Sequence, residues 1–83
     1  MPKPYNGHRS WNAWNVALWI GNDYGLYQSA IECIESSRTW GSATSKFIAL
    51  VGENTKTPDG ARYNRTCVFE ALKGLDHPLK ASA

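Results

Sequence analysis

The sequence predicts an all-α protein: a compact single domain of three to four short helices. Apolar residues recur at the three- and four-residue spacing of amphipathic helices, and residues that cap or end helices stand between these segments. The 83 residues are enough for one core, and large aromatic side chains suit so small a domain. We expect a flexible N-terminal arm at residues 1–9, the helical domain at residues 10–76 and a flexible C-terminal tail at residues 77–83.

The first expected helix begins where Ser10 or Asn12 can cap it through a side-chain oxygen. Gly21 is placed to end this helix in a left-handed conformation. The apolar face that we expect to point toward the core consists of Trp11, Trp14 and Leu18.

The second expected helix begins at Asn22 or Asp23 and ends before Ser36 and Ser37. Its apolar stripe is formed by Tyr27, Ala30, Ile31 and Ile34. The third element follows Trp40, which we place in a loop with Gly41. Ser42 or Thr44 can begin this element. Residues 46–51 suit either a helix or a buried strand, and we favour the helix because a lone strand has nothing to pair with.

The last expected helix follows the turn Thr57-Pro58-Asp59-Gly60, in which proline presets φ and glycine closes the turn. Asn64 or Thr66 can begin this helix, and Gly74 suits the left-handed position after its last turn. The core expected from all four elements is Trp14, Leu18, Ile31, Ile34, Phe47, Leu50, Val68 and Leu72.

No pattern in the sequence predicts catalysis, a metal or a cofactor. The side chains that could ligate a soft metal are too far apart in sequence to form the usual ligand pairs; they are His8, Cys33, Cys67 and His77. No nucleophile stands beside a basic partner, and no glycine-rich phosphate loop occurs. We therefore expect a protein that is not an enzyme, with both cysteines in its core.

Hydropathy indicates where the protein works. No apolar run approaches the roughly 20 residues that span a membrane, and the first residues lack the apolar centre of a signal peptide. We expect a cytoplasmic protein with reduced thiols and no membrane contact. The sequence does not indicate its oligomeric state.

Tryptophans and tyrosines are crowded between residues 11 and 27, and the helices there cannot bury all of them. An aromatic side chain left at the surface is a typical anchor for a protein partner, and asparagines beside it add hydrogen-bonding groups. The candidate protein-binding residues are Trp11, Trp19, Tyr24 and Asn15.

The basic residues support a second hypothesis. The net charge of +2 is too small to predict a nucleic-acid partner, but residues 38–83 carry seven basic and four acidic side chains. Cations beside a helix N-terminus suit phosphate groups. The candidate nucleic-acid-binding residues, around the turn and along the last helix, are Lys56, Arg62, Arg65 and Lys73.

Two segments carry a family resemblance. The first contains Trp14, Asn15-Val16, Leu18-Trp19, Asn22-Asp23 and Leu26-Tyr27; the second contains Thr57-Pro58-Asp59-Gly60-Ala61, Val68 and Ala71-Leu72. In this order the segments resemble a group of short uncharacterised proteins carried by bacteriophages and related mobile elements. Where that group usually has an acidic residue after Asn-Asp, this chain has Tyr24. The resemblance implies a phage setting and does not imply a reaction.

These observations predict a small non-catalytic phage accessory protein that binds a host protein or protein complex. The sharpest version is an inhibitor of a host defence system, such as an anti-CRISPR protein. The alternative is a small helical DNA- or RNA-binding protein that uses the basic residues named above.

Overall fold

Four helices make up most of the computed structural model, which describes residues 10–52 and 55–80. They are α1 (Trp11–Asn22), α2 (Tyr24–Glu35), α3 (Trp40–Val51) and α4 (Arg65–Gly74). The all-α prediction is confirmed, and residues 46–51 form a helix and not a strand. Between α3 and α4, the described residues contain one isolated antiparallel bridge, which joins Lys56 to Arg62.

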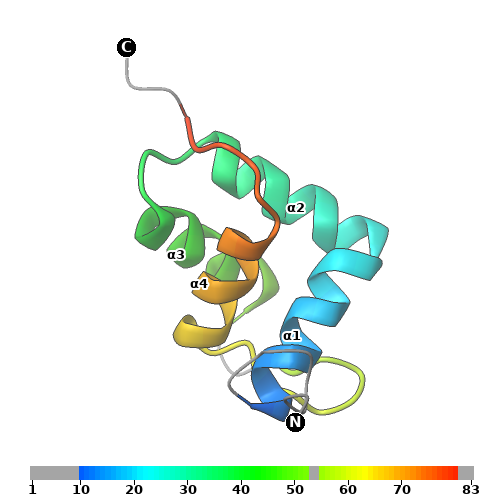
Figure 1. Cartoon of the computed structure of the whole chain (residues 1–83). Coiled ribbons are helices and arrows are strands. Elements are labelled where there is room, and N and C mark those ends of the chain that lie inside the picture. Colours follow the sequence, from blue (N-terminus) through cyan, green and yellow to red (C-terminus); the bar gives the residue numbers. More distant parts are fainter. Residues whose placement is uncertain (1–9, 53–54, 81–83) are drawn as a thin grey trace, which may run out of the picture.

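The helices form a ring in chain order (Figure 1). α1 packs against α2, α2 against α3 and α3 against α4, and α4 closes the ring by packing against α1. The segment that carries the turn at residues 57–60, yellow in Figure 1, lies beside α1. Two segments that are far apart in the sequence are therefore brought together at α1.

A side-chain oxygen caps the start of every helix, so that one of the N–H groups left without an intrahelical partner is bonded. Ser10, Asp23 and Asn64 cap α1, α2 and α4, as the sequence predicts. The expected start of α3 is wrong by a few residues. Thr39 caps it by accepting a hydrogen bond from the Ser42 backbone N–H at 3.0 Å, so residues 40–41 form the first turn and not a loop.

The corner between α1 and α2 consists of one residue, Asp23. Its backbone is extended, its N–H donates to the Trp19 carbonyl at 2.9 Å, and its side chain accepts from the Leu26 N–H at 2.9 Å. The prediction that Gly21 ends α1 is wrong, because Asp23 closes one helix and caps the next without any left-handed residue. The left-handed residue after α4 is likewise Asp76, with φ of 57°, and not Gly74, which is the last residue of the helix.

Replacing Asp23 with alanine is expected to lower the free energy of unfolding by about 1 kcal/mol, because the cap of α2 is lost. The matched control is Asn22→Ala at the exposed neighbouring position, which makes no capping bond and should change stability by less than about 0.5 kcal/mol. Urea denaturation followed by circular dichroism measures both changes. Equal losses in the two variants would contradict the role of Asp23.

The core lies inside the ring and confirms half of the expected residues. Ile34, Phe47, Val68 and Leu72 are fully buried. Trp14 and Ile31 are only partly buried. The predictions for two leucines are wrong, because Leu18 is 36% exposed and Leu50 is 64% exposed.

The direction in which each helix faces explains both leucines. The stripe of α3 that points inward runs through Trp40, Thr44, Phe47 and Val51, and Leu50 lies to one side of it. Leu18 belongs to a face of α1 that points away from the core, and this face is central to the candidate site.

Candidate functional site

α1 carries three stripes of residues, each with i, i+3, i+7 spacing, and the stripes meet different surroundings. The inner stripe is buried in the core and consists of Ala13, Val16 and Ile20. The second stripe consists of Asn12, Asn15 and Trp19 and contacts residues 57–67. We call it the hairpin stripe, because these residues include the turn and one side of the Lys56–Arg62 bridge. The outer ridge is half-buried to exposed and consists of Trp11, Trp14 and Leu18. Because successive residues lie about 100° apart around the axis, the outer ridge is nearly opposite the inner stripe.

The expectation that Trp11, Trp14 and Leu18 face the core is therefore wrong. The inner stripe of alanine, valine and isoleucine is buried in the core, where α1 packs against its neighbours in the ring. The hairpin stripe must also face residues 57–67, because its asparagines bond there. Because these two faces of α1 point toward the core and toward residues 57–67, the remaining stripe, which is the outer ridge, points toward solvent.

The hairpin stripe holds the turn at residues 57–60 against α1. The turn forms as predicted, with Gly60 N–H donating to the Thr57 carbonyl at 2.8 Å and Gly60 in the left-handed region at φ of 97°. Asn12 bonds both backbone groups of Arg62, since its Oδ1 accepts from the N–H and its Nδ2 donates to the carbonyl, each at 2.8 Å. The Asn12 amide thereby bonds the backbone edge of Arg62 that faces away from the Lys56 bridge, as a neighbouring strand would.

Asn15 is at the centre of this contact. Its Nδ2 donates to Asp59 Oδ2 at 2.9 Å, and its Oδ1 accepts from the Thr57 hydroxyl at 2.6 Å. The Thr57 oxygen in turn accepts from the Ala61 N–H at 3.0 Å. Asn15 is 1% exposed, so the expectation that it belongs to a surface for a partner is corrected: its amide is used inside the protein.

Trp19 donates to the same carboxylate oxygen as Asn15. Its indole N–H donates to Asp59 Oδ2 at 2.9 Å, and its side chain is partly buried. These two hydrogen bonds, that from Asn15 first and that from Trp19 second, lower the pKa of the Asp59 carboxyl below its ordinary value of 3.8. Asp59 is itself exposed, so the charged carboxylate remains in contact with water.

The lowered pKa predicts how stability depends on pH. A carboxyl whose pKa is lower in the folded state stabilises the fold above its unfolded pKa, and this contribution is lost as pH falls through the folded pKa. Wild-type protein should therefore lose melting temperature below about pH 3.8, and Asp59→Asn should lose less over the same interval. Thermal melts of both proteins between neutral and acidic pH measure this, and parallel curves would contradict the bonds to Asp59.

The outer ridge is the largest apolar feature that α1 presents to solvent. Trp11 is 40% exposed, Leu18 is 36% exposed, and Trp14 between them is partly buried. Beyond the corner at Asp23, Tyr24 and Tyr27 of α2 are also exposed. Trp11 and Tyr24, which the sequence predicted as contact residues, are exposed, whereas the exposure of Leu18 was not predicted, because its helical spacing with two tryptophans is equally typical of a core residue.

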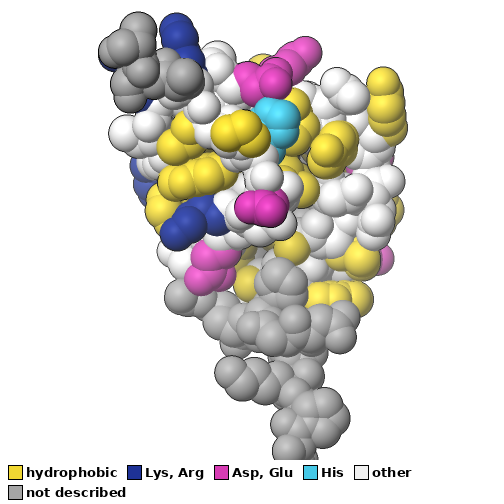
Figure 2. Space-filling view, turned by 45° about the horizontal axis from the view of Figure 1, so that its top comes forward, with side chains coloured by type: hydrophobic (Ala, Val, Ile, Leu, Met, Phe, Trp, Pro, Cys, Tyr) yellow, Lys and Arg dark blue, Asp and Glu magenta, His cyan; other side chains and the backbone are white. Residues whose placement is uncertain are grey.

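The four basic candidates are all exposed, and two of them, Arg65 and Lys73, line one hollow on α4. Lys56 and Arg62 are paired across the bridge. Arg65 donates to the Ser45 hydroxyl at 2.8 Å and the Gly41 carbonyl at 3.1 Å, so it fastens α4 to α3. Lys73 lies over the Phe69 ring, 5.4 Å from its centroid. Figure 2 shows basic and acidic side chains interspersed among hydrophobic ones on the face in view.

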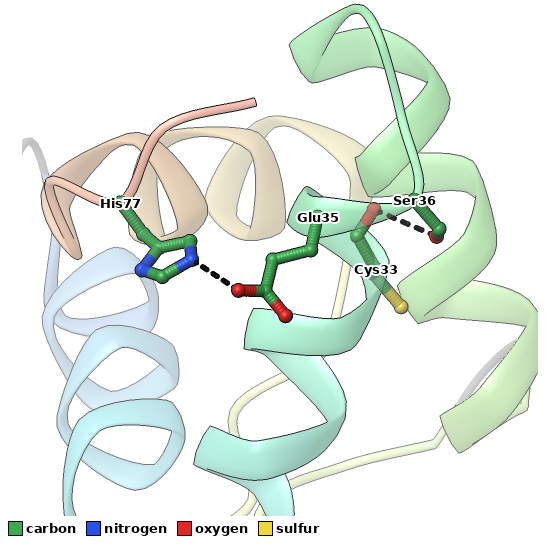
Figure 3. Close-up of polar contacts among 4 residues, drawn as sticks. All are labelled: Cys33, Glu35, Ser36 and His77. Carbon is green, nitrogen blue, oxygen red and sulfur yellow. Dashed lines mark hydrogen bonds and ion pairs between the residues drawn. The ribbon is translucent and has the colours of Figure 1, made fainter. Parts of the chain in front are cut away.

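Among the described residues, the two cysteines are buried and His77 contacts a carboxylate of α2. Cys33 and Cys67 are free and buried, and burial, only partly offset by Lys46 and reinforced by Glu32, raises the pKa of the Cys33 thiol. Figure 3 shows Glu35 pointing toward His77, whose Nε2 lies 3.0 Å from the carboxylate, while Ser36 bonds the Cys33 carbonyl. His8 lies outside the described residues. Within residues 10–52 and 55–80, no three His, Cys, Asp or Glu side chains gather as metal ligands do.

None of the helices in the described part of the chain is long and apolar enough to cross a membrane.

No curated protein and no solved structure matches the chain. One family model, described as a family of unknown function (DUF7249), matches residues 1–76. The match includes α1 and the turn that its hairpin stripe holds. The protein therefore belongs to DUF7249, a family of unknown function.

Proposed function

We propose that this protein is a non-catalytic phage accessory protein that binds a host protein complex in the bacterial cytoplasm through the outer ridge of α1. The sharpest form of the proposal is an inhibitor of a host defence complex, of the anti-CRISPR kind. The outward direction of the ridge is the observation that carries the binding mode. The phage setting rests on the resemblance of the segments that contain Trp14 to Tyr27 and Thr57 to Ala61.

The energetics of α1 support a binding surface. Apolar surface removed from water stabilises a protein by roughly 25 cal/mol per Å², so a helix that turns two tryptophans and a leucine outward forgoes part of this stabilisation. A partner that covers the ridge recovers it. Tryptophan is also among the residues that dominate binding energy at protein interfaces, since it combines a large apolar area with few rotatable bonds.

The other polar groups of the helix have structural uses. Asn12, Asn15 and the Trp19 indole bond residues 59–62, which leaves the apolar ridge as the stripe of α1 without such bonds. The proposed contact therefore consists of the ridge residues, with Tyr24 and Tyr27 beyond the corner as further exposed aromatics.

One observation favours nucleic-acid binding as the second candidate. Lys56 and Arg62 stand directly opposite each other across the antiparallel bridge, and like charges in that position destabilise the pairing. Neither cation has an acidic partner among the described residues. A phosphate backbone would relieve their repulsion.

An affinity capture from lysate of the bacterial host, with and without nuclease, separates the two candidates. Protein binding predicts one complex that survives nuclease and moderate salt. Nucleic-acid binding predicts nucleic acid with its associated proteins, a steep loss as salt rises, and a loss in the double variant Lys56→Gln/Arg62→Gln. Capture that disappears with nuclease would contradict the main proposal, and capture of nothing would contradict both.

A further inference from the structure

A hollow of about 490 Å³ with polar and charged residues in its wall lies at the junction of α2 and α3. The connection between the two helices forms most of its wall, the first turn of α3 contributes Ser42, and the segment after α4 contributes Lys80. The Lys80 backbone N–H donates to the Ser37 carbonyl at 2.8 Å, which holds these two segments together. The residues that line this junction hollow are Ser36, Ser37, Arg38, Thr39, Ser42 and Lys80.

The charges around the junction hollow favour an anion. Arg38 and Lys80 are exposed cations in its wall. α3 begins here, at its cap Thr39, and is 12 residues long with no acidic residue in its first turn. The first N–H groups of a helix carry partial positive charge and lack intrahelical partners, and this end of the helix attracts phosphate groups.

Ser37 is an observation independent of the charges that also points to a binding site. It lines the junction hollow, is only 2% exposed, and its Oγ has no hydrogen-bond partner among the described residues. A buried hydroxyl without a partner is uncommon and unfavourable. A ligand oxygen at the floor of the hollow would supply the acceptor, after rotation of the hydroxyl between its staggered positions.

The negative end of α2 faces the same junction but is already neutralised. The Ser36 N–H and hydroxyl bond the carbonyls of Glu32 and Cys33, and Lys46 Nζ donates to the Ser36 carbonyl at 2.6 Å. The Glu35 carboxylate is turned toward His77, as Figure 3 shows. None of these groups is a wall residue except Ser36, so the acceptors of α2 do not oppose an anion in the hollow.

We propose that the junction hollow binds the phosphate group of free phosphate or of a small phosphate monoester, held by the first turn of α3, Arg38, Lys80 and the Ser37 hydroxyl. Two cations and one helix N-terminus suit a single phosphate group, whereas a polynucleotide backbone is bound by a longer row of cations. This site could not be predicted from the sequence, because Lys80 is 42 residues from Arg38 and joins it only in the fold.

Titration of the full-length protein with inorganic phosphate, and separately with glycerol phosphate, tests the proposal by two-dimensional NMR at constant ionic strength. We expect saturable shifts of the backbone amides from Arg38 to Ser42. Arg38→Gln should weaken affinity about tenfold, whereas the matched charge change Lys56→Gln on the distant bridge should leave it unchanged. The tighter of the two ligands identifies the source of the phosphate group.

Ser37→Ala separates binding from folding. Because the hydroxyl has no partner, its removal should not lower the melting temperature of the free protein, yet it should weaken phosphate binding about fivefold. Shifts that do not saturate, or that are equal in Arg38→Gln and Lys56→Gln, would overturn the proposal. An oligonucleotide that shifts the same amides at lower concentration than phosphate does would also overturn it.

Discussion

Asn15→Asp is expected to lower the free energy of unfolding by about 3–5 kcal/mol at neutral pH, although the two side chains have nearly the same shape. The new carboxylate would replace an amide that is 1% exposed and that donates to Asp59 Oδ2 at 2.9 Å. The variant thus exchanges a hydrogen bond for two like charges at contact distance. The bond from the Thr57 hydroxyl to Oδ1 can remain, so the loss is confined to the side that faces Asp59.

Acid should reduce this loss. Burial and the neighbouring carboxylate raise the pKa of the new acid in the folded state, so its penalty grows as pH rises above the unfolded value of about 4 and disappears below it. Urea denaturation at neutral pH and near pH 4 measures the difference from wild type. The control is Asn22→Asp at the exposed end of α1, which should cost less than about 1 kcal/mol. A small, pH-independent loss at Asn15 would contradict its buried position.

Phe47→Ala is expected to cost about 3–5 kcal/mol, because the ring is fully buried and its removal leaves a cavity among the four helices. The ring also packs against Tyr63, with the two ring centroids 6.2 Å apart. Domains of this size are stable by only about 5–15 kcal/mol, so part of the variant population should be unfolded at the upper end of this loss.

The matched control for Phe47→Ala lies three residues further along α3. Leu50 is 64% exposed, and Leu50→Ala should cost less than about 1 kcal/mol. Thermal and urea denaturation of the two variants compare a buried with an exposed apolar residue of the same helix. A loss at Leu50 as large as that at Phe47 would mean that α3 turns a different face toward the core.

The sequence was sufficient to predict the fold class, most of the caps and the turn at residues 57–60, because local residues determine each of these. Ser10, Asp23 and Asn64 act on backbone groups three residues away, and Pro58 and Gly60 set their own dihedral angles. Gly21 shows the limit of the same reasoning, since a helix can end at a capping aspartate without using the glycine before it.

The orientation of α1 could not be predicted, because its three stripes have the same period and two of them are apolar. The stripe with the two tryptophans was predicted to face the core because its side chains are the largest. The deciding contacts are those of Asn12 and Asn15 with residues 57–62, which lie 42 to 50 residues away in sequence and leave no local pattern. The protein-binding hypothesis keeps Trp11 and Tyr24 as exposed residues, whereas Asn15 and the Trp19 indole are used by the fold.

The central claim is that the outer ridge of α1 is a surface for a protein partner. The most direct test compares the yield of the captured host complex for Trp11→Ala and Leu50→Ala, two variants that shorten an exposed apolar side chain on different helices. We predict that Trp11→Ala lowers the affinity about thirtyfold, the effect of losing an interface anchor worth roughly 2 kcal/mol, while Leu50→Ala captures as much complex as wild type. Equal capture by both variants would contradict the claim.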